Sequence, residues 1–222
     1  MILIGVALFA ALSYTVVDMI RGGDSAMSIS EEKAGIYASE IIDYARTVRQ
    51  VVQELRIDGC DDTEISFENP VVVGYTNGTN TACQVFHMDG GALSWQKPPE
   101  PFTNISLLKT GSTNSDYIFT NNRILKGAVE VGTSESDLLM ILPITGNFCA
   151  IINEKLGNSN ESEDPGIHNI SMFTGGYSSS NEISSTNYTQ GCFCDRQAGG
   201  SNLCNAAFEN KDHYFFQVLI AR

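Results

Sequence analysis

The fold is decided by residues 1–17, MILIGVALFAALSYTVV, and by the periodic segment that follows at residues 28–55. The first stretch carries no charge, and with residues 18–20 it reaches the roughly 20 residues that a helix needs to span the hydrocarbon core of a bilayer. A secretory signal peptide places Lys or Arg ahead of its apolar region, and none precedes this stretch. We therefore expect the chain to begin inside an apolar helix.

A helix break and a second helix come next. Gly22 and Gly23 each weaken a helix by about 1 kcal/mol relative to Ala, which predicts a kink or a melted turn. Ser28 and Glu31 have the spacing of a capping box, and Gly59 is placed to stop the helix. The spacing of three or four predicts an amphipathic helix over residues 28–57, with an apolar face of Ala34, Tyr37, Ile41, Ala45, Val48, Val52 and Leu55. Its other face is polar, with Glu32, Lys33, Glu40, Asp43, Arg46, Arg49, Gln53 and Glu54.

This order of segments resembles the type IV pilin and pseudopilin superfamily. The matching residues are Leu3 and Ile4 at the start of the apolar span, residues 6–12 rich in Ala, Leu and Val, the Gly22-Gly23 break and the helix of residues 28–55. The resemblance implies an α+β fold, in which a long N-terminal helix packs on the antiparallel β-sheet of a head domain with long disulfide-bearing loops. The helix would be residues 1–57, apolar over residues 1–20 and amphipathic over residues 28–57, and the head would be residues 58–222.

In that superfamily, the apolar helices of many subunits pack together in the core of a filament. The residues that the resemblance places in such contacts are Met1, Ile2, Leu3, Ile4, Val6, Leu8, Phe9, Leu12, Val16, Asp18 and Arg21. The family usually carries Glu at the fifth mature position, where it pairs with a neighbour's N-terminal amine, whereas this chain has Gly5. Either the mature start lies upstream of Met1, or the subunit does without that pairing and uses Asp18 and Arg21. A pair of these two residues within one helix, worth roughly 0.2–0.5 kcal/mol, is the alternative for them.

The head is predicted to be rich in strands. Residues 70–75, 82–87 and 92–95, separated by Asn77-Gly78 and Asp89-Gly90-Gly91, predict an antiparallel meander. Residues 117–119 and 123–125 predict a hairpin around Asn121-Asn122, and residues 137–142 a buried strand ended by Pro143. Residues 148–156 predict a short helix, capped by Thr145 or Asn147 and closed by Gly157. Residues 213–220 predict the last strand, and residues 158–166 and 175–191 predict surface loops.

Six cysteines form an even set, so disulfides are expected in a chain that looks exported. They are Cys60, Cys83, Cys149, Cys192, Cys194 and Cys204, and fifteen pairings are possible. A zinc knuckle of Cys192, Cys194 and Cys204 is the alternative, but no nearby His completes it. Calcium is a second weak candidate, held by Glu161, Glu163 and Asp164 without the residue order of a defined calcium loop. No other cofactor is expected.

Charge and motifs narrow the function. The net charge of −13 would repel phosphate backbones and disfavours nucleic-acid binding. No phosphate-binding loop, zinc-protease or serine-hydrolase motif stands in a supporting context, and His87, His168 and His213 are far apart, so no enzymatic activity is expected. Glycosylation sequons occur at Asn77, Asn104, Asn160, Asn169 and Asn187, little more often than chance would give.

The sequence therefore favours a structural subunit of a pilus-like filament of identical copies, resident in the inner membrane before assembly and extracellular afterwards. Adhesion, motility, DNA uptake and secretion share this subunit design. A minor pseudopilin or a membrane-anchored periplasmic binding module of a secretion system is the alternative, and Gly5 favours it slightly because subunits at filament tips can dispense with the usual Glu.

Overall fold

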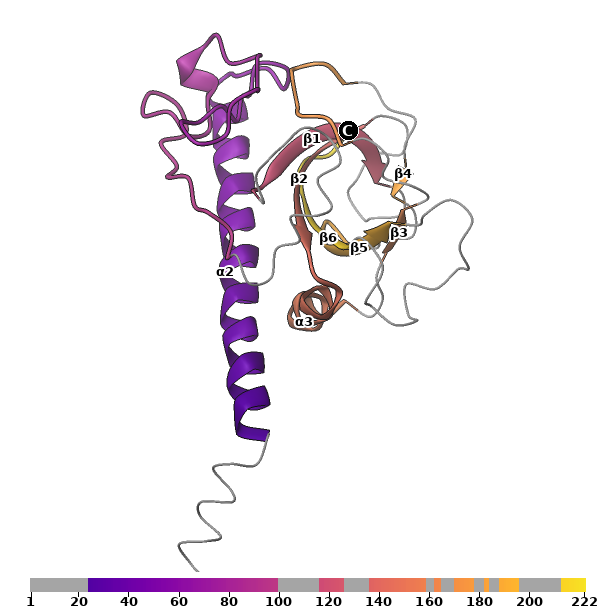
Figure 1. The fold of residues 1–222 in the computed structure, drawn as a ribbon. Helices are drawn as coiled ribbons and strands as arrows, with labels where there is room; N and C mark the ends of the chain where they lie inside the picture. Colours follow the sequence, from indigo (N-terminus) through magenta and orange to yellow (C-terminus); the bar gives the residue numbers. More distant parts are fainter. Residues whose placement is uncertain are drawn as a thin grey trace, which may run out of the picture. The chain divides into compact units, whose positions relative to one another are not determined.

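The computed structural model describes residues 24–99, 116–125, 136–158, 162–164, 170–177, 182–183, 188–195 and 213–222. The chain forms two units, Met1–Ile36 and Tyr37–Arg222, and the long helix α2 (Asp24–Ile57) passes from the first into the second. The larger unit is α+β, with the C-terminal part of α2 packed on an antiparallel sheet, as the sequence predicts (Figure 1). The predicted apolar helix and the break at Gly22-Gly23 lie outside the described residues.

Helix α2 is longer than its sequence signals predict. It begins at Asp24, so the Ser28-to-Glu31 motif lies inside the helix, and the predicted start at residue 28 is wrong. The helix ends at Ile57, and Gly59 follows with φ of 103°, a conformation that glycine adopts without strain. Ile41, Ala45, Val48, Val52 and Leu55 are buried, which confirms the predicted apolar face.

The sheet has six strands in the order β3-β5-β6-β2-β1-β4. Its antiparallel centre consists of β5 (Gln190–Asp195), β6 (His213–Ile220), β2 (Asp137–Ile144) and β1 (Ile118–Leu125). Two short strands, β3 (Ser162–Asp164) and β4 (Glu182–Ile183), pair in parallel at the edges. The predicted strands at residues 137–142 and 213–220 are confirmed, although Pro143 lies within β2 and does not end it.

Strands β2 and β6 form the interior of the sheet, because every residue of both is buried. A continuous apolar run is typical of a strand that is covered on both faces. Ile141 and Phe216 are paired across the two strands, and both belong to one apolar cluster on the sheet. The cluster consists of Ile118, Leu139, Ile141, Ile170, Phe193, Tyr214, Phe216 and Val218.

Strand β1 corrects a predicted turn. The hairpin expected around Asn121-Asn122 is absent, since β1 runs through both residues as one strand. Its register against β2 shifts between Thr120 and Arg123, so the two asparagines occupy an irregularity in the ladder. A bulge inserts an extra residue and bends the strand locally, and turn-forming residues tolerate that conformation. The Asn-Asn signal therefore marks a bulge.

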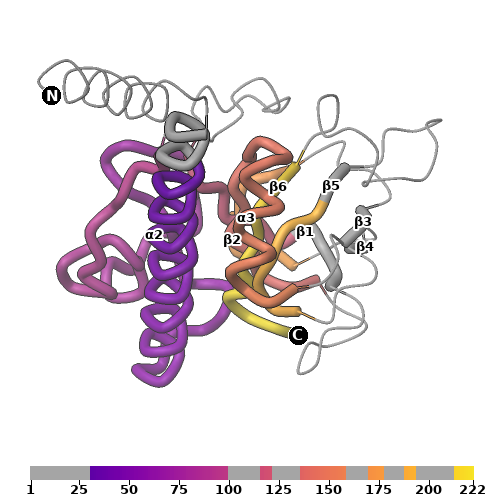
Figure 2. Tube along the Cα trace, turned by 90° about the horizontal axis from the view of Figure 1, so that it is seen from below, coloured from indigo at the N-terminus to yellow at the C-terminus, as the bar shows by residue number. Residues whose placement is uncertain are grey.

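Helix α3 (Gly146–Leu156) agrees with its prediction. Thr145 is the N-cap residue, although its side chain makes no capping hydrogen bond, and Gly157 closes the helix with φ of 71°. The Asn153 side chain fixes α3 to the sheet, because its Oδ1 accepts the Cys192 backbone N–H at 3.0 Å. Figure 2 shows α2 between α3 and the sheet on one side and residues 58–99 on the other.

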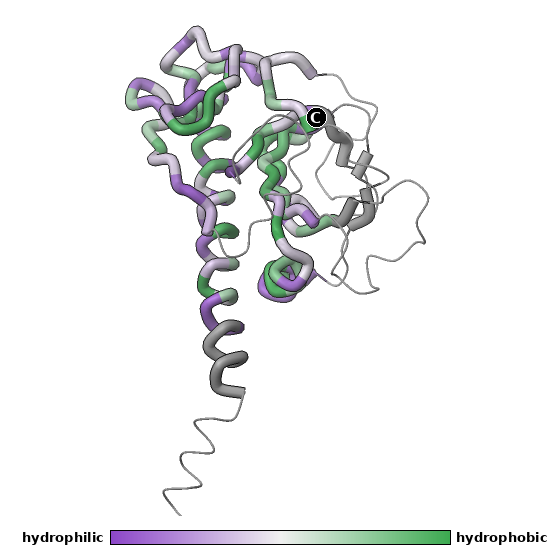
Figure 3. Tube along the Cα trace, viewed as in Figure 1, coloured by the Kyte–Doolittle hydropathy of each residue, from purple (hydrophilic) through white to green (hydrophobic). Residues whose placement is uncertain are grey.

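Residues 58–99, here called the loop layer, contain no strand, so the predicted meander is wrong. Their regular structure is the 3-10 helix η1 (Thr81–Cys83) and one isolated bridge between Ser66 and Gln84. Side chains accept hydrogen bonds from backbone N–H groups that would pair with a neighbouring strand in a β-sheet. Glu68 Oε2 accepts the N–H groups of Gly74 and Tyr75, at 3.2 and 3.0 Å. Figure 3 shows the contrast between the mostly hydrophobic central strands and the mixed loop layer.

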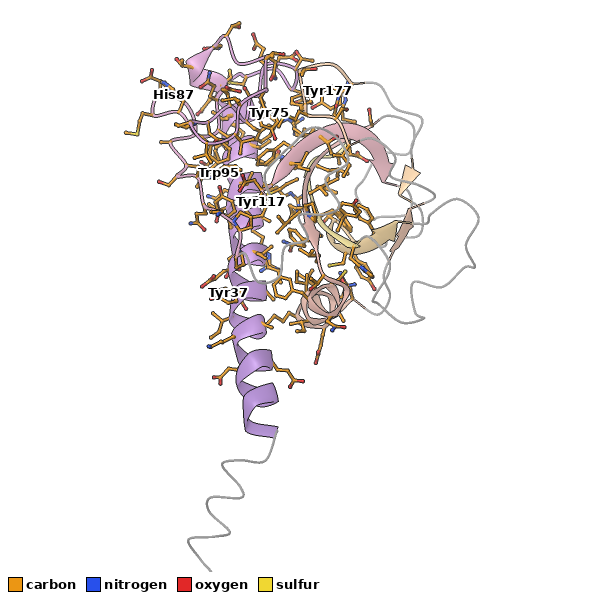
Figure 4. The ribbon with its side chains drawn as sticks, in the orientation of Figure 1. Tyr37, Tyr75, His87, Trp95, Tyr117 and Tyr177 are labelled. Atoms are coloured by element: carbon orange, nitrogen blue, oxygen red, sulfur yellow. A yellow bond between two sulfur atoms is a disulfide. The ribbon has the colours of Figure 1, made fainter. Side chains whose placement is uncertain are left out.

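Aromatic rings join the loop layer to the sheet. Phe67 stacks on Phe119 of β1 with ring centroids 3.9 Å apart, and Phe173 contacts the edge of Phe67. The Tyr75 hydroxyl oxygen accepts the Phe119 N–H at 3.1 Å. Tyr75, Trp95 and Tyr117 gather in this region, whereas His87 lies on the outer side of the loop layer (Figure 4).

Candidate functional site

The predicted assembly residues, from Met1 to Arg21, lie outside the described residues. What the structure describes of α2 beyond them is an exposed polar stripe along Glu40, Asp43, Thr47, Gln50 and Glu54. These residues recur every three or four positions and so share one face of the helix. The stripe is an exposed polar surface of α2 within the larger unit.

Contacts within this stripe are weak. Asp43 and Arg46 form an ion pair at 3.5 Å, and Gln50 Nε2 donates to Glu54 Oε1 at 2.8 Å. Exposed pairs of this kind contribute little to stability, because water and salt screen them. Two residues predicted on this polar face, Arg49 and Gln53, are instead half-buried. Gln53 Nε2 donates to the Leu219 carbonyl of β6 at 2.7 Å, so this residue ties α2 to the sheet.

A cavity of about 520 Å³ opens at the C-terminal end of α2. It contains an ion pair of Arg56 Nε with Asp62 Oδ1 at 2.7 Å. Its lining residues are Gln53, Arg56, Ile57, Cys60, Asp61, Asp62, Thr63 and Arg222. The cavity therefore presents carboxylates and guanidinium groups next to the end of a helix.

Hydrogen bonds and charge hold one carboxylate of this cavity ionised. The Thr63 N–H and hydroxyl both donate to Asp61 Oδ1, at 2.9 and 2.7 Å, and lower the pKa of the Asp61 carboxyl. The positive charge of Arg222 lowers it further. The Arg222 guanidinium lies 4.2 Å from the centre of the Tyr177 ring. Burial, assisted by the negative charge of Asp62, raises the pKa of Tyr177, so that this phenol stays neutral.

A second cavity, of about 230 Å³, is also lined by Cys60. Its lining residues are Leu55, Asp58, Gly59, Cys60, Glu64, Asn80, Ala82, Cys83, Asp89 and Gly90. Cys60 lines both cavities and Cys83 lines the smaller one; the two cysteines form a disulfide with Cα atoms 5.7 Å apart. The bond joins the end of α2 to η1 in the loop layer, a pairing that the sequence left open among its expected disulfides.

The structure describes the side chains of two more of the predicted cysteines. Cys149 and Cys192 are buried, at 0% and 2% exposure. Cys204 and the side chain of Cys194 lie outside the described part of the chain, so the zinc knuckle stays a prediction there. Within the described residues, no three His, Cys, Asp or Glu side chains are grouped so as to hold a metal ion. The calcium candidates Glu161, Glu163 and Asp164 fall where no side chain is described.

Buried acid and phenol groups lie near the aromatic contacts. Burial raises the pKa of Tyr44 to about 12, against a hydrogen bond from the Gln96 N–H at 3.2 Å that lowers it. Burial also raises the pKa of Tyr117, and that of the Asp116 carboxyl, which Lys97 partly offsets. Tyr44 is therefore neutral at ordinary pH and serves as a hydrogen-bonding group. The arrangement supports packing and offers no matched acid and base.

One predicted glycosylation site is used structurally. Asn77 Nδ2 donates to the carbonyl oxygens of Thr63 and Ile65, at 3.1 and 2.7 Å. A glycan at Nδ2 would compete with these contacts, so Asn77 is a poor acceptor in the folded chain. The other four sequons lie outside the described residues, as does His168, whereas His213 is buried in β6 and His87 is at the surface.

Of the helices in the described residues, neither α2 nor α3 has a segment long and apolar enough to cross a bilayer. Comparison of the chain with protein-family models, with curated proteins and with solved structures found no match.

The cavities at the end of α2 were not among the predicted sites. They bring residues 53–64 together with residues 80–90 and Arg222, which are far apart in the sequence. One local signal was present: the residues around Cys60 read DGCDD, with three acidic residues beside a cysteine.

Proposed function

We propose that this chain is a structural subunit of a type IV pilus-like filament. It would reside in the inner membrane through its apolar N-terminal segment and move into an extracellular filament of identical copies. The proposal assigns no catalytic step, metal or nucleic acid to the chain. The apolar residues 1–17 would replace lipid contacts by contacts with neighbouring copies, each buried large side chain contributing roughly 1.5–3 kcal/mol.

The observation that carries the proposal is the continuity of α2. The helix begins at Asp24, directly after the apolar stretch and the two glycines, and runs for 34 residues, or about 51 Å, to Ile57. Its part from Tyr37 onward has one face in the core of a head that contains an antiparallel sheet. The pilin resemblance implies a helix that joins an apolar segment to a sheet-bearing head, and the length of α2 supports the proposal for that reason.

Substitution within the apolar segment tests the proposal. Cells that produce the full chain are sheared, and the chain is quantified in the released surface fraction and in the membrane. We expect filaments in the sheared fraction of the wild type, and at least a tenfold loss of them with Phe9→Arg, because a charge in a packed apolar core has no partner. Thr47→Arg, which adds the same charge at an exposed position of α2, should leave the yield unchanged. Equal filament yields for all three chains would contradict an assembly role for residues 1–17.

The alternative is a scarce tip subunit or an anchored binding module, which Gly5 favours. The number of copies per filament distinguishes a main filament subunit from a tip subunit. A main filament subunit should make up most of the protein in purified filaments, whereas a tip subunit should be present at about one copy per filament. Quantitative mass spectrometry of the sheared fraction measures this ratio directly.

A further inference from the structure

The disulfide of Cys60 and Cys83 is more open on one sulfur than on the other. Cys83 is buried at 2% exposure, whereas Cys60 is half-buried and lines both cavities at the end of α2. A thiolate that approaches from solvent therefore meets Cys60 first. Exchange depends on access to the attacked sulfur and on the local concentration of the thiolate, so the charges around Cys60 bear on its rate.

Acidic residues line both cavities that Cys60 lines. Asp61 and Asp62 line the larger cavity, and Asp58, Glu64 and Asp89 line the smaller one; together these residues are called the carboxylate ring. The larger cavity also holds Arg56 and Arg222, and Arg56 is paired with Asp62. Among the residues that the structure describes, no Lys or Arg lines the smaller cavity, and Asp89 lies 3.6 Å from His87 Nδ1.

We propose that the carboxylate ring makes the Cys60–Cys83 disulfide selective for the net charge of the thiolate that attacks it, so that its reduction slows as that thiolate carries more negative charge and is fastest with a zwitterionic one. Where the available thiols carry additional negative charge, the disulfide is then reduced slowly and continues to cross-link the loop layer to the end of α2. This inference does not depend on filament assembly, because it concerns one bond within the unit Tyr37–Arg222.

The exchange takes place in two balanced steps. The thiolate of a small thiol attacks Cys60 Sγ, the bond between the two protein sulfurs breaks, and Cys83 leaves as a thiolate that takes a proton from water. A second thiolate then attacks the outer sulfur of the mixed disulfide, releases the small disulfide, and leaves Cys60 as a thiolate. Two electrons pass from two small thiols to the protein.

Three thiols of different charge test the proposal on the full chain in a mild uncharged detergent. At the reacting thiolate, mercaptoethanesulfonate carries two negative charges, mercaptoethanol one, and cysteamine none overall. Reduction is followed by alkylation and peptide mapping of Cys60 and Cys83, and each rate is normalised to the rate of the same thiol with hydroxyethyl disulfide. The normalisation removes the differences in thiol pKa and intrinsic nucleophilicity.

We expect the normalised rate of cysteamine to exceed that of mercaptoethanesulfonate by about tenfold at 10 mM salt, and by about twofold or less at 1 M salt, where the Debye length is about 3 Å. Asp58→Asn combined with Asp89→Asn should reduce the low-salt ratio to about threefold. Glu40→Gln combined with Asp43→Asn is the matched control, because it removes the same charge about 20 Å or more along α2 and should keep the tenfold ratio.

Three results would overturn the proposal. They are equal normalised rates for the three thiols at low salt, an equal loss of selectivity in the ring variant and in the matched control, and failure of all three thiols to reduce the bond. The mapping also shows whether a ring variant is still oxidised before the reaction begins, so that a misfolded variant is recognised.

Discussion

Two structures cover α2 in the larger unit, and they are stable for different reasons. On one side lies the sheet, where β2 and β6 are buried over their full length and paired by a backbone ladder. On the other side lies the loop layer, where Asn69 Oδ1 accepts the N–H groups of Val71 and Val72 and a disulfide ties Cys60 to Cys83. The sheet depends on apolar burial, and the loop layer depends on a few specific contacts.

This difference predicts which substitutions destabilise each part of the larger unit. A buried apolar strand tolerates substitutions that keep the side-chain volume and the apolar pattern, because its stability is distributed over many contacts. A loop that forms no β-sheet hydrogen bonds loses its conformation when one side chain that bonds to its backbone, or one cross-link, is removed, because its backbone groups have few other partners. Substitutions in the loop layer should therefore act locally, whereas substitutions at the boundary between the two structures should affect both.

The largest effect is expected at that boundary. Phe119 is fully buried in β1, stacks on Phe67 of the loop layer, and also contacts Tyr75. Phe119→Ala should lower the free energy of unfolding by about 3–5 kcal/mol, because it leaves a cavity between both structures. Urea unfolding of the full chain in detergent measures the loss, and Met88→Ala, at a position 84% exposed, is the control. A loss below about 1 kcal/mol would contradict the role of Phe119.

Removal of the disulfide separates the two structures. Cys60 and Cys83 are 23 residues apart, and the double variant Cys60→Ala, Cys83→Ala should lose about 3 kcal/mol of stability, because the cross-link restricts the unfolded chain. Amide hydrogen exchange should accelerate in residues 61–95 well before it does in β2 and β6. Uniform acceleration across the sheet and the loop layer would show that the two do not open separately.

A smaller effect is expected where the loop layer touches α2. A Cβ atom at Gly91 would lie 2.3 Å from Val51 Cγ1 and 2.6 Å from the Val85 carbonyl oxygen. Gly91→Ala should therefore lower the free energy of unfolding by about 1–3 kcal/mol through overpacking. Gly176→Ala is the matched control, since nothing lies within 4 Å of its added Cβ, and its effect should stay within about 0.5 kcal/mol. Equal effects at both glycines would exclude close packing at Gly91.

The smallest effect is a pH dependence at Asp61. Its pKa is lowered in the folded chain, so its contribution to stability is present above its unfolded pKa of about 3.9 and is lost as the pH falls through the folded value. Asp61→Asn should therefore be slightly less stable than the wild type at pH 7, and the difference should shrink below pH 4. Urea unfolding at a series of pH values measures this. A difference that grows on acidification would show that the sign is wrong.

The parts of the fold that the sequence predicts are those with a continuous apolar signal. Residues 137–142 and 213–220 are dense in large apolar side chains, and they are the buried strands β2 and β6. Helix α3 was predicted with Gly157 as its end. Strands β3, β4 and β5 were missed, because they lie in or next to segments rich in Ser, Asn and Gly and pair through backbone groups that composition does not reveal.

The loop layer and its cavities needed tertiary information. Residues 70–75 have the composition of a strand, but Glu68 and Asn69 bond to their amides, and Val71 and Val73 are left exposed. The carboxylate ring combines residues 58–64 with Asp89, which no local spacing connects. The sequence suggested disulfides, but the pairing of Cys60 with Cys83 depends on how the loop layer folds back over the end of α2.

Electron cryomicroscopy of native surface material that contains the chain tests the central proposal most directly. We predict helical filaments whose central density is a bundle of apolar helices, each continuous with α2 and each carrying one head on the outside. Monodisperse single copies anchored in membrane, with no filaments even when the chain is abundant, would contradict the proposal.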